Sequence, residues 1–119
     1  MSLVADLQAQ VGESLRAVAT YEEDEWTLRY ECDDIKAKPR IFDKIHEELI
    51  LEDMGTEYLE SVFQVGQLNC TMHSFEEAMC FHFVRGSLQG VFVSIEPETM
   101  VSLEEFVNVC KESEIEPSS

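Results

Sequence analysis

The sequence predicts an α+β fold: a five-stranded, largely antiparallel sheet with helices packed on it. Segments in which apolar and polar residues follow a strand pattern occur five times. Segments with apolar residues at helical spacing precede, separate and follow these strands. The resulting order is α-β-β-α(α)-β-β-β-α, and two β-hairpin units separated by helix favour one sheet covered by helices. A chain of 119 residues with 45% hydrophobic residues suits a single domain with one core.

The N-terminal segment predicts one helix followed by two strands. Ser2 is a candidate N-cap, and the apolar positions behind it recur at helical spacing: Leu3, Val4, Leu7, Val11 and Leu15. Residues 17–21 and 26–32 read as strands joined by the acidic turn 22–25. The second strand has one apolar side and one wet side, because its residues alternate strictly. The apolar side consists of Trp26, Leu28, Tyr30 and Cys32.

The middle of the chain predicts two helices. Pro39 fits the first turn of the longer helix, whose apolar positions are Ile41, Phe42, Ile45 and Leu49. Gly55 ends this pattern, and Thr56 is a candidate N-cap for a second, shorter helix that Gly66 ends. The apolar positions of the shorter helix are Tyr58, Leu59, Val62 and Phe63.

The C-terminal half predicts three strands and a helix. The strands fall at about 68–75, 78–85 and 90–96, with Gly86 and Gly90 around the second turn. The helix opens with a capping box, Ser102 and Glu105. Its expected buried positions are Leu103, Phe106, Val107 and Cys110. We therefore expect one domain over residues 1–112 and a disordered acidic tail over 113–119.

The charge of the chain is strongly negative and evenly spread. The sequence has 25 Asp and Glu against 8 Lys and Arg, a formal net charge of −17. Such a surface repels itself unless salt screens it, and at about 1 M salt the Debye length falls to roughly 3 Å. The composition therefore favours a salt-adapted protein, with an ordinary acidic protein and a mimic of nucleic-acid charge as alternatives. We expect no binding to nucleic acid or to anionic membranes, which require a basic surface.

One basic cluster and four cysteines complete the composition. The cluster is Lys36, Lys38, Arg40 and Lys44, which we interpret as a locally neutralised linker, with an anion-contacting or partner-contacting patch as the alternative. The cysteines lack CxxC spacing and fall in apolar patterns, as expected for buried free thiols in a reducing compartment. No apolar run approaches the ~20 residues of a membrane span. These features predict a soluble, cytoplasmic protein.

Two stretches carry a resemblance to a known family. The segments LRAVATYEEDEWTLRYECDDI (15–35) and GQLNCTMHSFEEAMCFHFVRGSLQGVFVSIE (66–96) resemble a family of small acidic haloarchaeal proteins of unknown function. This resemblance implies a salt-adapted protein and provides no activity and no site residues. The order of the elements is similar to the roadblock/longin and profilin-like architecture, in which a terminal helix pair covers one face of the sheet.

The hairpin over residues 68–85 holds the only candidate site. If Glu76 and Glu77 form a two-residue turn, one face of the hairpin carries Cys70, Met72, Met79, Phe81 and Phe83, which is core. The other face carries His73, Cys80 and His82, whose imidazole and thiolate groups suit zinc or copper. A slip of one residue in register would scatter this cluster, so dispersed structural side chains are the competing interpretation.

No catalytic motif accompanies this hairpin. Cys80 and His73 could pair as thiolate and base, but no orienting group or oxyanion donor is identifiable, and neighbouring carboxylates would raise the pKa of the thiol. No phosphate-binding glycine motif occurs. We therefore expect a non-enzymatic interaction or regulatory module without a cofactor, and a homodimer formed through residues 41–63 and 68–75. A metal- or redox-responsive protein that uses His73, Cys80 and His82 is the alternative.

Overall fold

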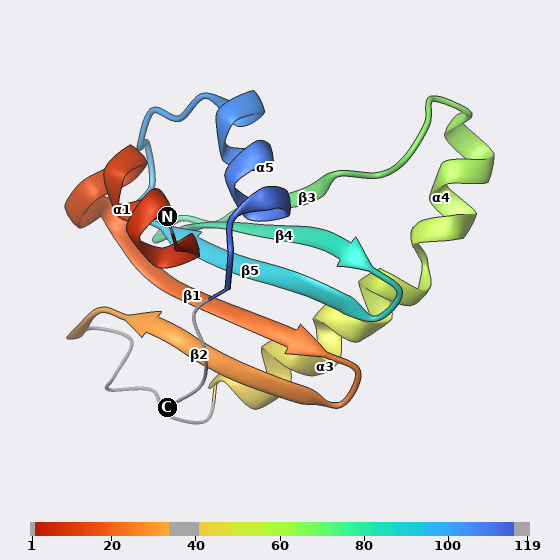
Figure 1. Ribbon diagram of the computed structural model, residues 1–119, viewed down its shortest axis with the longest axis horizontal. Coiled ribbons are helices and arrows are strands. Elements are labelled where there is room, and N and C mark those ends of the chain that lie inside the picture. The colour runs from red at the N-terminus through yellow and green to blue at the C-terminus, as the bar shows by residue number, and fades with distance from the viewer. Residues whose placement is uncertain (1, 34–40, 116–119) are drawn as a thin grey trace.

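The protein forms one five-stranded antiparallel sheet in the order β2-β1-β5-β4-β3 (Figure 1). The computed structural model describes residues 2–33 and 41–115. The strands are β1 (Leu15–Glu22), β2 (Glu25–Glu31), β3 (Cys70–Ser74), β4 (Met79–Gly86) and β5 (Gln89–Ile95). The predicted fold class and order of elements are therefore confirmed.

Helices cover both faces of the sheet (Figure 1). α1 (Leu3–Val11) and α5 (Leu103–Glu112) lie on one face, and α3 (Ile41–Met54) lies on the other. α4 (Thr56–Phe63) follows α3 directly and stands away from the sheet. A 3-10 helix at Gly12–Ser14 connects α1 to β1. Pro39 and the cations Lys36, Lys38 and Arg40 lie outside the described residues.

The core between the sheet and the terminal helices is aromatic at its centre. The Phe106 ring of α5 meets the Phe81 and Phe83 rings of β4 edge to face, with centroid separations of 5.0 and 5.6 Å. Such edge-to-face pairs are favourable because the positive ring edge faces the negative ring face. The buried partners from α1, β1 and β5 are Leu3, Leu7, Val11, Leu15, Val18, Val91, Val93 and Ile95, with Cys110 from α5.

A smaller core lies between the sheet and α3. Its buried members are Ala17, Ala19 and Tyr21 of β1, Leu49 of α3 and Phe92 of β5, and partly buried side chains such as Trp26, Leu28 and Ile45 pack around them. β2 does not keep the predicted strict alternation. The register shifts between Val18 and Ala19, so Tyr30 packs against the other core instead of joining Trp26 and Leu28. A β-bulge of this kind moves the following side chains to the opposite face.

The predicted register of the β3–β4 hairpin is confirmed. Cys70 pairs with Phe83, Thr71 with His82, and His73 with Cys80. The Phe75 amide also donates to the Ala78 carbonyl across the turn, at 2.8 Å. The turn formed by Glu76 and Glu77 therefore sets which side chains share a face.

Several residues at the ends of helices differ from their predicted roles. The Ser102 hydroxyl accepts from the Glu105 amide, so one bond of the capping box is confirmed. Ser2 makes no side-chain cap, and its backbone instead bridges to Glu114. Thr56 is the first residue of α4 rather than its cap, and its hydroxyl donates to the Glu52 carbonyl. Leu103, which we expected to be buried, is exposed.

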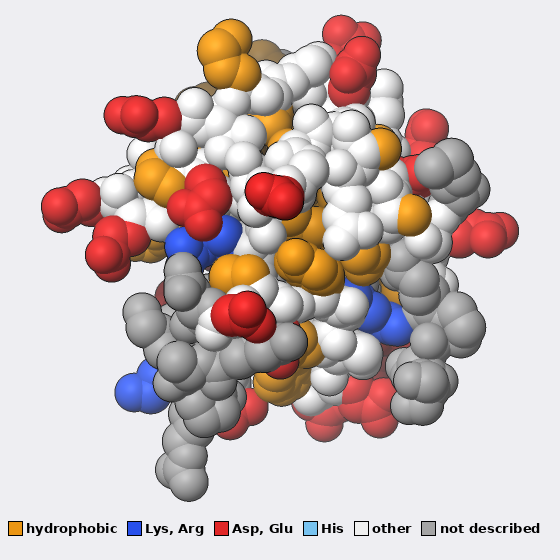
Figure 2. Space-filling model, turned by 90° about the vertical axis from the view of Figure 1, so that its left-hand side faces the viewer, with side chains coloured by type: hydrophobic (Ala, Val, Ile, Leu, Met, Phe, Trp, Pro, Cys, Tyr) orange, Lys and Arg blue, Asp and Glu red, His pale blue; other side chains and the backbone are white. Residues whose placement is uncertain are grey.

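The chain remains packed for three residues beyond the predicted domain end. The Ser113 hydroxyl donates to Asp6, and the Leu3 amide donates to the Glu114 carbonyl, which ties the segment to α1. Residues 116–119 of the predicted tail lie outside the described residues. No helix within the described residues is long and apolar enough to cross a membrane. Figure 2 shows acidic side chains distributed over the face it views rather than gathered at one spot, in line with the evenly spread charge of the sequence.

Candidate functional site

The three predicted metal-site residues share one face of the sheet but have different surroundings. His82 is buried beneath α3, and Cys80 points into a pocket beside it. His73 is exposed on the edge strand and lines the same pocket as Cys80. Within residues 2–33 and 41–115, no three His, Cys, Asp or Glu side chains are arranged to hold a metal ion. The shared face was predicted correctly, and the side chains on it separate into a buried polar network and a pocket.

The buried polar network connects α3 to two strands of the sheet. The Tyr21 hydroxyl donates to Asp53 Oδ2 at 2.6 Å and also lies 2.6 Å from His82 Nε2. Asp53 Oδ1 accepts from the Leu88 amide in the β4–β5 turn, at 3.1 Å. On the far side of the imidazole, His82 Nδ1 lies 3.5 Å from Glu52 Oε2. Tyr21, Asp53 and His82 are buried, so the network is closed to solvent along most of its length.

The directions of the hydrogen bonds show which atoms of this network carry protons. Because the Tyr21 hydroxyl proton goes to Asp53, the His82 Nε2–H must donate to the Tyr21 oxygen. A neutral imidazole then presents a lone pair at Nδ1 to Glu52 Oε2, which has no hydrogen-bond partner among the described residues. Burial lowers the pKa of His82, and the Glu52 carboxylate opposes this shift. The network therefore holds a neutral histidine and has room for one more proton between His82 and Glu52.

Tyr21 occupies its position because a glycine lies beneath it. A Cβ atom at Gly90 would lie 2.6 Å from the Tyr21 hydroxyl oxygen and 2.6 Å from the Phe83 carbonyl, inside van der Waals contact. Burial and the bond to Asp53 raise the pKa of the Tyr21 hydroxyl far above its ordinary value. A buried Tyr21 that keeps its proton and is held by Asp53 indicates a structural role for this network.

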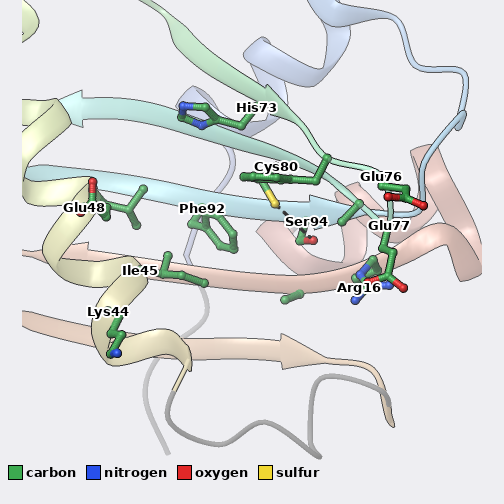
Figure 3. Close-up of a pocket in the computed structure, with 14 residues that line it drawn as sticks. Arg16, Lys44, Ile45, Glu48, His73, Glu76, Glu77, Cys80, Phe92 and Ser94 are labelled. Atoms are coloured by element: carbon green, nitrogen blue, oxygen red, sulfur yellow. Dashed lines mark hydrogen bonds between the residues drawn. The ribbon is translucent and has the colours of Figure 1, made fainter.

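A pocket of about 740 Å³ opens beside the network, between the first half of α3 and the β3–β4 hairpin (Figure 3). Its apolar wall comes from α3, β1, β5 and the β3–β4 turn, and includes Ala17, Ile45, Leu49, Ala78 and Phe92. The described charged side chains that line it are Arg16, Lys44, Glu48, Glu76 and Glu77. A volume of this size lies within the range of about 300–1,000 Å³ that small-molecule sites occupy.

Cys80 and Ser94 form the polar part of the pocket floor (Figure 3). The Cys80 thiol donates weakly to the Ser94 hydroxyl oxygen, with a separation of 3.7 Å. Burial raises the pKa of the Cys80 thiol, while the Ser94 bond and Arg16 act in the opposite direction. The predicted role of neighbouring carboxylates in raising this pKa is therefore wrong, although its direction is right. A protonated Cys80 is a poor nucleophile, and its thiol contacts Ser94 rather than the predicted base His73.

Exposed apolar side chains are numerous on α4, on the segment after it and along the edge strand β3, and we call these residues the α4–β3 surface. Its side chains include Tyr58, Val62, Phe63, Val65, Met72 and Phe75. Phe63 is 66% exposed, Val65 86%, Met72 53% and Phe75 60%. Single exposed apolar residues are common in proteins, but this many exposed apolar side chains in one short stretch of the chain favour a contact surface.

Sequence reasoning missed both the polar network and the pocket. Glu52 and Asp53 sit near the end of the predicted helix, where two acidic residues are typical of a solvated surface. Tyr21 fits the pattern of its predicted strand, and nothing in the sequence around it indicates a hydrogen-bond partner. The pocket depends on where α3 crosses the sheet, and no local pattern specifies that position. The α4–β3 surface, in contrast, falls within the segments 41–63 and 68–75 that were predicted to associate, except for Val65 between them.

A five-stranded antiparallel sheet with helices on both faces defines this protein as a small α+β domain. The chain belongs to the family described as Domain of unknown function (DUF7522), which matches residues 1–114. No curated protein and no solved structure matches it. The haloarchaeal and the roadblock/longin resemblances remain predictions.

Proposed function

We propose that this protein is a small non-enzymatic interaction module that forms a homodimer through the α4–β3 surface in a salt-rich cytoplasm. The observation that carries the proposal is the charge pattern of this surface. Residues 61–75, which hold most of this surface, contain no Asp, Glu, Lys or Arg, although 28% of the chain is charged. Glu57 and Glu60, in the first half of α4, border it. A surface selected only for solubility would carry charge here, because the rest of the chain does.

The edge strand β3 supports the same proposal. Natural sheets protect exposed edges with charged residues or proline, which oppose pairing with another chain. β3 has the sequence CTMHS and carries neither. The opposite edge strand, β2, begins and ends with glutamate and carries Arg29 on its length. The two edges of the sheet therefore differ in the way expected if one edge faces a partner and the other faces water.

A second copy of the chain is the occupant that the charges favour. Two molecules with a net charge of −17 repel each other, so an interface between them must lie where carboxylates are sparse. A nucleic acid or an anionic membrane would gain nothing from this surface, which has no cations to displace counterions.

The test is the mass in solution, measured by light scattering at several KCl and protein concentrations. We expect a mass twice that of the 13.6 kDa chain, and a dimer fraction that rises with KCl because salt strengthens apolar contacts. Phe63→Asp should shift the equilibrium toward the monomer. Met100→Asp is the matched control, because Met100 is 92% exposed and lies outside the α4–β3 surface. A monomer under all conditions, or equal effects of the two substitutions, would contradict the proposed dimer.

A further inference from the structure

The pocket between α3 and the β3–β4 hairpin is unexplained by self-association. It lies on the side of the sheet that α3 covers only in part, so the side chains of β1, β4 and β5 line an open floor there (Figure 3). The buried network next to it is closed, and the core on the opposite face is filled by aromatic rings. A concave apolar site with a few polar groups is the usual form of a small-molecule site.

The floor of this pocket is apolar with a single neutral polar pair. Phe92 and Ile45 present their side chains toward the centre, and Cys80 and Ser94 lie between them and the hairpin (Figure 3). Ser94 is buried, and its hydroxyl oxygen accepts from the Cys80 thiol. A hydroxyl that accepts one bond still has a proton to donate, and no acceptor for this proton is found among the described residues. A bound molecule with an acceptor oxygen would therefore complete the hydrogen bonding of Ser94.

The most buried charge beside the pocket is a cation that already has a carboxylate partner. The Arg16 side chain is 14% exposed, and its guanidinium lies 3.7 Å from the Glu96 carboxylate, although its Nε–H has no hydrogen-bond partner among the described residues. Glu76 and Glu77 stand at the same end as Arg16 (Figure 3), so an anion there would meet two carboxylates. A cation would lose its hydration against Phe92 and Ile45 without a carboxylate on the floor. The free-energy cost of burying an unpaired ion exceeds the free energy gained from apolar contact.

From these observations we infer that the pocket binds a neutral aromatic or alicyclic molecule that carries one hydrogen-bond acceptor. The apolar body lies against Phe92, Ile45 and Leu49, and the acceptor oxygen takes the proton of the Ser94 hydroxyl. This binding site adjoins the proposed dimer contact, because His73 of β3 and Phe75 line the pocket, but α4 and Phe63 do not.

Three naphthalene probes of similar shape and different charge test the inference: 1-acetylnaphthalene, 1-naphthoate and 1-naphthylmethylammonium. Binding is followed by the amide NMR shifts of Cys80, Phe92 and Ser94 in the full chain. We expect saturable binding of the ketone, with an affinity about tenfold higher than that of either ion, because a hydrophobic pocket discriminates by amounts of this order. Tightest binding of the naphthoate would assign the pocket to Arg16 and overturn the inference, as would tightest binding of the ammonium probe or no saturable shifts.

Two substitutions connect the binding to the pocket. Ala78→Trp fills the pocket wall and should abolish binding, whereas Ala9→Trp on the exposed side of α1 should leave it unchanged. Ser94→Ala should weaken the ketone about fivefold, the value of one neutral hydrogen bond, and leave 1-ethylnaphthalene unaffected. If Ala78→Trp does not fold, the binding of the ketone and of 1-ethylnaphthalene to Ser94→Ala tests the proposed site instead. Equal losses for both ligands in Ser94→Ala would exclude the proposed hydrogen bond. The same titration of Phe63→Asp should give unchanged affinity, which separates ligand binding from dimer formation.

Discussion

Replacement of Tyr21 by phenylalanine tests the buried network most directly. The substitution removes one oxygen, which donates to Asp53 at 2.6 Å and lies 2.6 Å from His82 Nε2. The ring itself stays, so the apolar contacts with Ala19 and Leu49 are retained. The effect on stability therefore reports the hydrogen bonds rather than packing.

The expected magnitude follows from what the missing hydroxyl leaves behind. A hydrogen bond to a charged group contributes about 1.5–3 kcal/mol, and an unsatisfied buried donor costs about 1–3 kcal/mol. Asp53 keeps its bond from the Leu88 amide, which limits the loss on that side. We expect Tyr21→Phe to lower the free energy of unfolding by about 3 kcal/mol. For a domain of this size that corresponds to a decrease in Tm of about 12 °C.

The assay is urea unfolding at constant, high KCl, with thermal unfolding as a second measurement. Tyr58→Phe is the matched control, because Tyr58 is 70% exposed on α4 and its change should stay within about 0.5 kcal/mol of zero. A double-mutant cycle with Asp53→Asn should show a coupling energy of about 1–3 kcal/mol. A loss below about 0.5 kcal/mol for Tyr21→Phe, or no coupling to Asp53, would refute the assignment of the network as a structural connection.

Two further predictions concern the solvent. The Tm should rise between about 0.1 and 3 M KCl as the Debye length falls from ~10 Å to below ~3 Å, and a Tm that is flat or falls with KCl would contradict salt adaptation. The free energy of unfolding should fall as pH drops below about 6.5, because the unfolded chain binds a proton at His82 that the folded protein resists. It should also fall above about pH 10 by about 1.4 kcal/mol per pH unit for Tyr21, since only the unfolded chain ionises there. His82→Gln should reduce the loss of unfolding free energy below about pH 6.5 more than His73→Gln does. Tyr21→Phe should reduce the loss above about pH 10. If neither substitution changes the pH dependence, other groups control the stability at both ends of the pH range.

Local patterns predicted the fold well because each element carries its own signal. Strand alternation, helical spacing and the turn at Glu76 and Glu77 gave the order of elements and the register of the β3–β4 hairpin. The errors occur where a nonlocal contact overrides a local preference. Ser2 is a good N-cap by sequence, but the Ser2–Glu114 bridge forms at that position. Tyr30 follows its strand alternation until a bulge moves it to the other core.

The candidate site could be predicted only in part for the same reason. The shared face of His73, Cys80 and His82 followed from the hairpin register, which is a local property. Which of these side chains contact one another depends on α3, which approaches from a different part of the chain. His82 meets Tyr21 and Glu52, residues far from it in sequence, and no periodicity within the hairpin encodes these contacts. The pocket is likewise a product of how helix and sheet dock.

The sequence separation of the network partners has a kinetic consequence. Tyr21 and Asp53 are 32 positions apart, and Tyr21 and His82 are 61 apart, so these bonds close long loops of chain. These bonds need the sheet and α3 to have come together first, so we expect them to form after the main folding barrier. Contacts that form late contribute little to the rate of folding and much to the barrier against unfolding. The network should therefore lengthen the lifetime of the folded state, and because it is buried, salt should change this contribution far less than it changes the surface repulsion.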